Sequence, residues 1–260
     1  MKKTILALSL AAMTLPAMAQ KAAEPDYTLE GNVGLFTDYR FRGISQTDLK
    51  PALQGGFDFS HKSGFYAGTW ASSISEYTSF NGAGLEIDFY AGYGSSIGGI
   101  DYDIGYLYYY YPGAENPEGG SKPNTGELYL GLTYGPATLK TSYSTSRYFG
   151  LPGTTGTLYY DLSASFPLSK SVTLNAHVGY LDLGKKLMAE TSAGVPYTVS
   201  SGTDYKIGLS TDLAGFSLAA DYVWNSGDWK KFNKDVEIDS TGKMKDLGKG
   251  GLVLSVSKSF

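Results

Sequence analysis

An alternation of apolar and polar residues with a period of two runs along this chain from about residue 27 to its end. From Tyr27 to Phe41, for example, the odd positions are mostly apolar and the even positions are mostly polar or glycine. Successive side chains of a β-strand point to opposite faces, so the pattern predicts strands with one apolar face. No run with the helical period of 3.6 residues follows residue 19. The predicted fold class is therefore all-β.

The pattern divides the chain into twelve predicted strands, and several have the roughly 9–11 residues that a tilted strand needs to cross a bilayer. Their ranges are 27–41, 51–61, 65–74, 83–94, 99–111, 125–135, 137–147, 156–166, 172–182, 203–213, 215–226 and 250–260. The connections alternate between short and long. The short ones lie near 62–64, 94–98, 135–136, 168–171 and 214–215, and the long ones at 42–50, 75–82, 112–124, 148–155, 183–202 and 227–249.

Short turns on one rim and long loops on the other are typical of a transmembrane antiparallel up-and-down β-barrel with short periplasmic turns and longer external loops. A soluble sandwich or lipocalin-like barrel also alternates, but it buries its apolar face. The polar face here carries too many carboxylates to bury in a dry core, namely those of Glu86, Asp88, Asp101, Asp103 and Asp161. The 22 tyrosines of the chain suit the aromatic girdles of a membrane barrel. We therefore favour the membrane barrel.

The third strand allows two orientations. If Lys62-Ser63-Gly64 is a three-residue turn with Gly64 in the left-handed conformation, Phe65 faces lipid and Trp70 faces the lumen. A two-residue turn reverses both. We favour the first.

The N-terminus has the features of a secretory signal peptide. Met1-Lys2-Lys3 is positively charged, an apolar run follows, and Ala17-Met18-Ala19 forms a cleavage site before Gln20. The predicted domains are a cleaved signal peptide at 1–19 and a barrel at 20–260. The chain has no cysteine, which suits an oxidising compartment, and its formal charge of −4 argues against a nucleic-acid partner.

Several longer strings of the sequence carry a family resemblance. They are residues 38–47 (Asp-Tyr-Arg-Phe-Arg-Gly-Ile-Ser-Gln-Thr), 51–58, 63–72, 86–93 and the Tyr-Tyr-Pro that ends at Pro112, followed by 148–150 and 177–180. In these strings the chain resembles the TorF family of porins. The resemblance implies a barrel in the outer membrane of a Gram-negative cell and supplies no catalytic residues. The terminal Phe260 on an alternating last strand also resembles the signal read by the outer-membrane assembly machinery.

Strand parity predicts which charged side chains face the lumen. The inward acids are Glu30, Asp38, Asp58, Glu86, Asp88, Asp101, Asp103, Glu127, Asp161, Asp212 and Asp221, and the inward bases are Arg40, Arg42, Lys140 and Lys206. From these we select as candidate pore-lining residues Arg40, Arg42, Asp58, Glu86, Asp88, Asp103, Glu127, Asp161 and Lys206. Such an excess of carboxylates favours cations over anions in a water-filled lumen. The alternative is a set of mutually paired charges that plugs the barrel. For Arg40 and Arg42 we favour an ion-pair network on the wall over a constriction.

No enzyme is predicted. His61 lies at a turn, and His177 faces inward, where Ser163 or Ser142 could meet it, but no sequence motif places a nucleophile beside it. Metal ligands do not cluster, and no cofactor is expected. The predicted function is an outer-membrane channel for passive diffusion of small hydrophilic solutes or ions, with outer-membrane lipid around it and a preference for cations. The alternative is a non-conducting barrel that acts through its long external loops as a binding or structural envelope protein.

Overall fold

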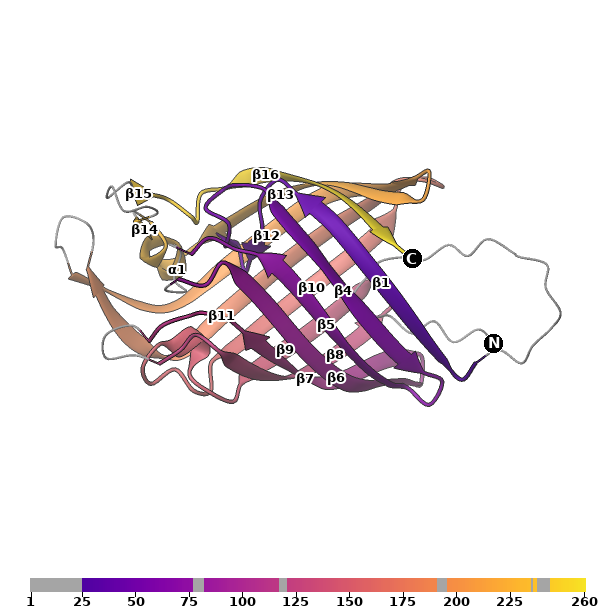
Figure 1. Ribbon diagram of the computed structural model, residues 1–260, viewed down its shortest axis with the longest axis horizontal. Coiled ribbons are helices and arrows are strands. Elements are labelled where there is room, and N and C mark those ends of the chain that lie inside the picture. Colours follow the sequence, from indigo (N-terminus) through magenta and orange to yellow (C-terminus); the bar gives the residue numbers. More distant parts are fainter. Residues whose placement is uncertain (1–24, 77–81, 117–120, 191–195, 235, 238–243) are drawn as a thin grey trace.

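The computed structural model describes residues 25–76, 82–116, 121–190, 196–234, 236–237 and 244–260. In these residues twelve strands form one closed antiparallel barrel (Figure 1), in the order β1-β16-β13-β12-β11-β10-β9-β8-β7-β6-β5-β4. The strands are β1 (Tyr27–Phe36), β4 (Ala52–His61), β5 (Phe65–Ser73), β6 (Leu85–Ile97), β7 (Ile100–Tyr110), β8 (Thr125–Tyr134), β9 (Ala137–Ser144), β10 (Leu158–Pro167), β11 (Thr173–Glu190), β12 (Pro196–Leu213), β13 (Phe216–Ser226) and β16 (Gly251–Ser259). The predicted all-β fold with twelve barrel strands is confirmed.

The remaining elements are short and lie in the connections between barrel strands. They are β2 (Arg40–Phe41), β3 (Ile44–Ser45), the 3₁₀ turn η1 (Tyr148–Gly150), α1 (Asp228–Phe232), β14 (Val236–Glu237) and β15 (Met244–Lys245). Figure 1 places α1, β14 and β15 at the end of the barrel opposite the C-terminus, as expected for the long connections. No helix in the described part of the chain is long and apolar enough to span a membrane.

The barrel is apolar on its outer face and polar on its inner face. On β8, Leu128, Leu130 and Leu132 are 42–50% exposed, whereas Glu127 and Tyr129 at alternate positions are at most 7% exposed. The other barrel strands alternate in the same sense, with leucine, isoleucine, valine and aromatic side chains on the outside. A soluble barrel would bury this apolar face, so the arrangement contradicts the soluble alternative and fits a lipid-facing exterior.

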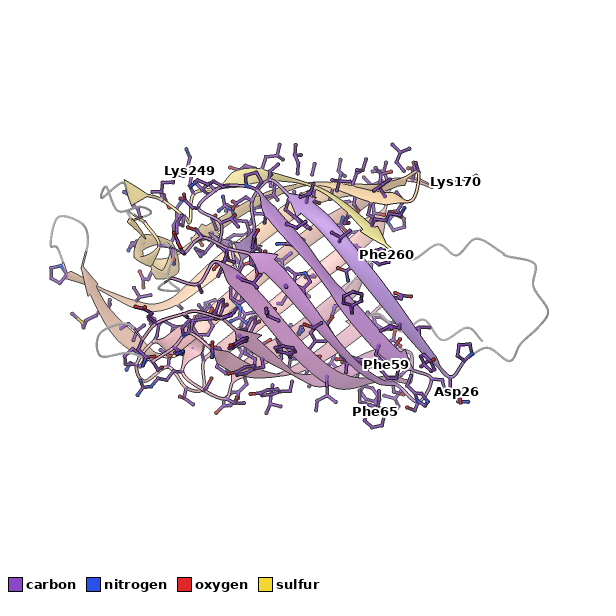
Figure 2. The ribbon with its side chains drawn as sticks, in the orientation of Figure 1. Asp26, Phe59, Phe65, Lys170, Lys249 and Phe260 are labelled. Atoms are coloured by element: carbon purple, nitrogen blue, oxygen red, sulfur yellow. The ribbon has the colours of Figure 1, made fainter. Side chains whose placement is uncertain are left out.

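Aromatic side chains gather on the outer face toward both ends of the barrel. At the end that holds the chain termini, Figure 2 shows Phe59, Phe65 and Phe260, and Tyr27 stacks on Phe59 with ring centroids 5.8 Å apart. Toward the long connections, exposed aromatic rings include those of Tyr106, Tyr108, Tyr110, Tyr143, Tyr160, Tyr180 and Tyr222. Aliphatic residues such as Leu130 and Leu162 lie between the two groups. Two such belts match the aromatic girdles of a membrane barrel.

The inner face is built from tyrosine side chains that lie over glycines of neighbouring strands. Tyr90 of β6 lies over Gly68 of β5, where an added Cβ would be 2.5 Å from the ring. Further pairs of this kind are Tyr66 with Gly92, Tyr129 with Gly105 and Tyr159 with Gly179. An aromatic ring packed over a strand glycine compensates for the missing side chain and pins the register. This packing gives several of the 34 glycines and 22 tyrosines of the chain a structural role in the wall.

The third strand has the first of its two predicted orientations. Gly64 has a positive φ of 103°, which closes the turn after β4. Phe65 is 62% exposed on the outer face, and Trp70 lies inside, with its ring edge-to-face on Tyr39 at 5.4 Å.

Two predicted boundaries are wrong, and the signal peptide is not described. The first strand ends at Phe36 rather than at residue 41, because the chain then turns into the lumen. The predicted loop at 183–202 is instead mostly an extension of β11 and β12, with a register shift between Asp182 and Leu187. The predicted signal peptide at 1–19 and parts of the long loops (77–81, 117–120, 191–195, 235 and 238–243) lie outside the described residues, so the predicted domain boundary after residue 19 stays a prediction.

A charge placed on the outer face should destabilise the barrel, while the same charge on the adjacent inner position should not. Ile207 is 49% exposed on the outside of β12, and Lys206 beside it faces inward. We expect Ile207→Arg to lower the free energy of unfolding by about 2–4 kcal/mol, the cost of an arginine on the lipid face near the bilayer midplane. Lys206→Arg is the matched control and should change it little. Urea unfolding in lipid vesicles measures both, and equal effects would contradict the assigned faces.

Candidate functional site: a hairpin across the lumen

A short β-hairpin between β1 and β4 enters the barrel lumen. Its strands β2 and β3 pair Arg40 with Ser45 and Phe41 with Ile44. The two residues of its turn, Arg42 and Gly43, have positive φ angles of 46° and 78°. Positive φ at both central residues is the geometry of a two-residue type I′ turn, for which Asn-Gly is the usual sequence. This lumen hairpin (residues 40–45) corrects the prediction that Arg40 and Arg42 belong to the end of the first barrel strand.

The base of the lumen hairpin is held by polar contacts within residues 38–47. Asp38 Oδ1 accepts hydrogen bonds from Ser45 Oγ at 2.6 Å and from Thr47 Oγ1 at 2.9 Å, and its other oxygen pairs with Arg40. The backbone N–H of Gln46 donates to the carbonyl of Tyr39 at 2.8 Å. A short acidic side chain that accepts from nearby hydroxyls stabilises such a tight turn of the chain.

The base is also attached to the connection that precedes β16. Arg40 Nη1 donates to the carbonyls of Leu247 at 3.1 Å and Lys249 at 3.0 Å. Asp48 is fully buried and pairs with Lys245 at 3.1 Å. Figure 2 shows Lys249 at the end of the barrel that carries the long connections. The hairpin is therefore fixed to the barrel at its base independently of its tip.

At the tip, Arg42 reaches the opposite wall of the barrel. Its Nη2 donates to both carboxylate oxygens of Glu127 on β8, at 2.8 and 2.9 Å. Its guanidinium lies over the ring of Tyr159 on β10, 4.1 Å from the centroid, and within 5.3 Å of Tyr148 in η1. β8 and β10 are on the far side of the ring from β1, where the hairpin starts. The hairpin thus bridges the lumen. We call Glu127, Tyr148 and Tyr159 the arginine cage.

The arginine cage is a desolvated site. The Arg42 and Glu127 side chains are 5% and 2% exposed. Burial alone lowers the pKa of Arg42, but the Glu127 carboxylate offsets this and the pKa ends above its ordinary value. Burial also raises the pKa of Tyr148 to about 12, so its hydroxyl stays neutral. Arg42 is charged at every accessible pH, and its Nη1 is buried without a hydrogen-bond partner.

A second group of buried acids lies on β6 beside the hairpin. Glu86 is 2% exposed and accepts hydrogen bonds from Tyr39 Oη and Tyr111 Oη, both at 2.7 Å. Asp88 is 7% exposed, and its Oδ1 has no hydrogen-bond partner. Tyr39 belongs to the hairpin base, so the hairpin contacts Glu86 at its base and Glu127 at its tip.

Nearer the termini, the lumen carries polar contacts between tyrosines, acids and bases. Tyr66 Oη donates to Asp103 at 2.5 Å, and Lys140 lies over the ring of Tyr129 at 3.9 Å. Asp58 accepts hydrogen bonds from Tyr90 and from Asn32. Lys206 is half-buried on the inward face of β12.

His177 lies between two carboxylates on the inner wall. Its Nε2 is 2.7 Å from Asp204 Oδ1, and its Nδ1 is 3.2 Å from both Asp161 Oδ1 and Ser163 Oγ. The sequence left a meeting of His177 with Ser163 open, and it occurs. Sequence analysis missed Asp204, although it lies two residues from Lys206 and so shares its inward parity. No group of three or more His, Cys, Asp or Glu side chains suited to a metal occurs in the residues the structure describes.

The structure places the candidate pore-lining residues in three settings. Arg42 and Glu127 form the ion pair at the hairpin tip, and Arg40 braces the hairpin base against residues 247–249. Glu86 and Asp88 lie buried together on β6. The others face the lumen from the wall and are Asp58, Asp103, Asp161 and Lys206. Their role in lining a pore stays a prediction.

The place of Tyr148 beside Arg42 could not be predicted from the sequence, because Tyr148 lies in a connection and no parity rule applies there.

A family model described as a bacterial protein of unknown function (Gcw_chp) matches residues 19–260. The chain belongs to the Gcw_chp family. Among curated proteins, none matches its sequence significantly. Similar solved structures include a KdgM porin in complex with disordered oligogalacturonate, with a TM-score of 0.50 and 9% identity over 89% of this chain and 98% of that one.

The NanC porin is also similar, with a TM-score of 0.49 and 9% identity over 88% of this chain and 98% of that chain. A TodX variant, a monoaromatic hydrocarbon channel, has a TM-score of 0.48 and 11% identity over 91% and 90%. At these identities, the likeness to the KdgM porin concerns the barrel fold alone.

Breaking the ion pair at the hairpin tip should destabilise the protein strongly. Glu127→Gln leaves the Arg42 charge buried without its partner, and we expect the free energy of unfolding to fall by about 3–5 kcal/mol. The matched control is Asp26→Asn, which breaks the exposed pair with Lys62 at 2.6 Å and should cost about 1 kcal/mol or less. Urea unfolding followed by tryptophan fluorescence measures both. A Glu127→Gln effect as small as that of the control would show that the ion pair contributes little to stability.

Proposed function

We propose that this protein is a porin-like channel of the Gram-negative outer membrane that passes small hydrophilic solutes by passive diffusion and prefers cations. The observation that carries the proposal is a closed twelve-stranded barrel with an apolar exterior and a carboxylate-rich interior. Water can fill such a lumen while lipid covers the outside. The motif strings that resemble the TorF porins support the same conclusion.

Three features support a location in the outer membrane. The two aromatic belts suit the two bilayer interfaces. The predicted signal peptide, cleaved near Ala19, would export the chain. Phe260 directly follows β16 and is 73% exposed, and we propose that the assembly machinery reads this strand.

The preference for cations follows from the charges on the inner wall. Eleven carboxylates occupy inward strand positions in the described residues: Glu30, Asp58, Glu86, Asp88, Asp101, Asp103, Glu127, Asp161, Asp204, Asp212 and Asp221. Two lysines, Lys140 and Lys206, occupy such positions, and Arg42 adds a charge from the hairpin. A lumen with this excess of negative charge attracts cations and repels anions. The KdgM porin was solved with oligogalacturonate, an acidic sugar, and we propose that such a ligand would be excluded here.

We propose no catalytic role for the wall histidine. A hydrolase needs a serine activated by histidine and N–H donors for the developing oxyanion. The Ser163 hydroxyl is shared between His177 and Asp161. Ser163 lies within the barrel ladder, opposite Thr138 and His177, so its strand offers no free N–H donors to the lumen.

The lumen hairpin favours the second candidate function, a non-conducting barrel that acts through its external surface. Residues 42–48 are all buried, and they obstruct the lumen near the long connections. The extended β11–β12 hairpin offers an external surface on that side (Figure 1).

Channel activity should be measurable with the refolded protein in a planar bilayer. We expect discrete conductance steps and a reversal potential shifted toward the cation in a salt gradient. Asp221→Lys should reduce this shift, because Asp221 lies on the inner wall and its charge acts on passing ions. Asp26→Lys is the control at the exposed rim. If both variants keep the wild-type reversal potential, the wall carboxylates do not set selectivity.

Removing the lumen hairpin should widen the channel. Tyr39 and Gln46 are already bonded across the hairpin base, so a Gly-Gly turn can replace residues 40–45. We expect single-channel conductance to rise by about twofold or more, because the narrowest section limits ion flow. Lys170→Ala, at the opposite end, is the control and should leave conductance unchanged. If neither the wild type nor the hairpin-free barrel conducts ions although each is verified as inserted, the non-conducting alternative is favoured.

A further inference from the structure

We propose that the arginine cage is a binding site for guanidinium-bearing solutes, and that Arg42 occupies it as an internal substitute for such a solute. The inference deepens the proposed function, on which it rests, by naming a substrate class and a site. In this arrangement an incoming guanidinium displaces the Arg42 side chain and opens the lumen at the hairpin tip.

The cage belongs to the barrel wall and its connections, so it persists when the Arg42 side chain leaves. Glu127 is on β8, Tyr159 is on β10 and Tyr148 follows β9. Wall residues also position the Glu127 carboxylate, since Tyr109 Oη and Ser144 Oγ each donate to it at 3.3 Å. Tyr159 Oη is held by Asp204 at 3.0 Å. The receptor for a guanidinium is therefore preorganised without the Arg42 side chain.

The chemistry of the cage selects a planar cation. A carboxylate and a flanking aromatic face match the N–H donors and the flat, weakly hydrated surface of a guanidinium. An alkylammonium makes point contacts and lacks the flat face that lies on the Tyr159 ring. The 4.1 Å distance from the Arg42 guanidinium carbon to that ring is within the range of a cation–π contact.

Arg42 itself is placed by the hairpin at some cost. Its φ of 46° is in the left-handed region, which disfavours an arginine and which glycine, asparagine or aspartate tolerate better. The hairpin is fixed at its base through Asp38, Arg40 and Asp48, so the tip side chain is not needed to attach it. A free guanidinium carries no such backbone constraint and can adjust its position in the cage.

A second acidic position lies beside the cage for a displaced or passing cation. Glu86 and Asp88 have no ion-pair partner among the described residues, and Asp88 Oδ1 is buried without a hydrogen bond. Both lie on β6, two strands from Glu127 in the ring. A cation that leaves the cage, or the Arg42 side chain once displaced, can interact with these carboxylates.

The test measures binding directly, apart from transport. Arg42→Ala is refolded in detergent, its folding is verified by heat-modifiable mobility, and methylguanidinium is titrated by calorimetry. We expect saturable binding with a dissociation constant at least tenfold lower than in Arg42→Ala/Glu127→Gln, and at least tenfold lower than in wild type, where Arg42 fills the site. Arg147→Ala removes an exposed arginine instead and should bind as wild type does. Acetate, an anion, should not bind.

A second variant, Arg42→Lys, tests the same site if Arg42→Ala does not fold. Arg42→Lys keeps the charge at the tip but loses the planar head group, and methylguanidinium should bind it more tightly than it binds wild type. Equal affinity in the folded single and double variants, or no saturable binding in any folded variant at position 42, overturns the proposed site. Methylguanidinium binding by a barrel that conducts no ions would contradict the channel function and support the binding site. Ion conductance without methylguanidinium binding would support the channel function and contradict the binding site.

Discussion

The pairing of every barrel strand with two neighbours is the constraint on which this structure depends. β1 meets β16 at the seam, with five residue pairs from Asn32–Ser259 to Phe36–Ser255, and the sheet has no open edge. Because the backbone hydrogen bonds are satisfied within the ring, the outer face can be apolar and lie against hydrocarbon. The same closure creates an interior that needs no apolar core, and this is why carboxylates, lysines and a histidine can occupy the inward positions.

Two small apolar clusters lie in the interior, one around Tyr109 and Tyr111 and one around Tyr159 and Leu181. The rest of the interior is organised by two kinds of contact. Tyrosines over glycines fill the wall of the lumen and leave their hydroxyls for acids such as Asp58 and Asp103. Near the long connections, the lumen hairpin joins the wall at β1 to β8 through the Arg42–Glu127 ion pair and to β10 through the Tyr159 ring. Gly43 lets the tip fit closely, because an added Cβ there would lie 2.8 Å from Cβ of Asp204. The wall and the hairpin therefore stabilise each other.

Much of the fold is predictable from the sequence because side-chain direction in a strand has a period of two. This parity placed Glu86, Asp88, Glu127 and Asp161 on the inner face, and it would also have placed Asp204. It failed at residues 38–41, where Tyr39 and Phe41 continue the alternation although the chain has already left the wall. The Arg42-Gly43 turn was the available signal, but arginine is unusual at such a position. The meeting of Arg42 with Glu127 could not be predicted, since it depends on which strands face each other across a closed ring.

The position of the hairpin also constrains how the barrel is made. The hairpin follows the first strand, yet its partners are at Glu127, Tyr159 and Leu247, so its contacts join parts of the chain that are far apart in sequence. Contacts of this kind form late, because long loops must close before they can form. The tip contacts in particular require β8 and β10 to be in place across the ring from β1. The lumen is therefore filled at the hairpin tip only after the wall that receives Arg42 has formed.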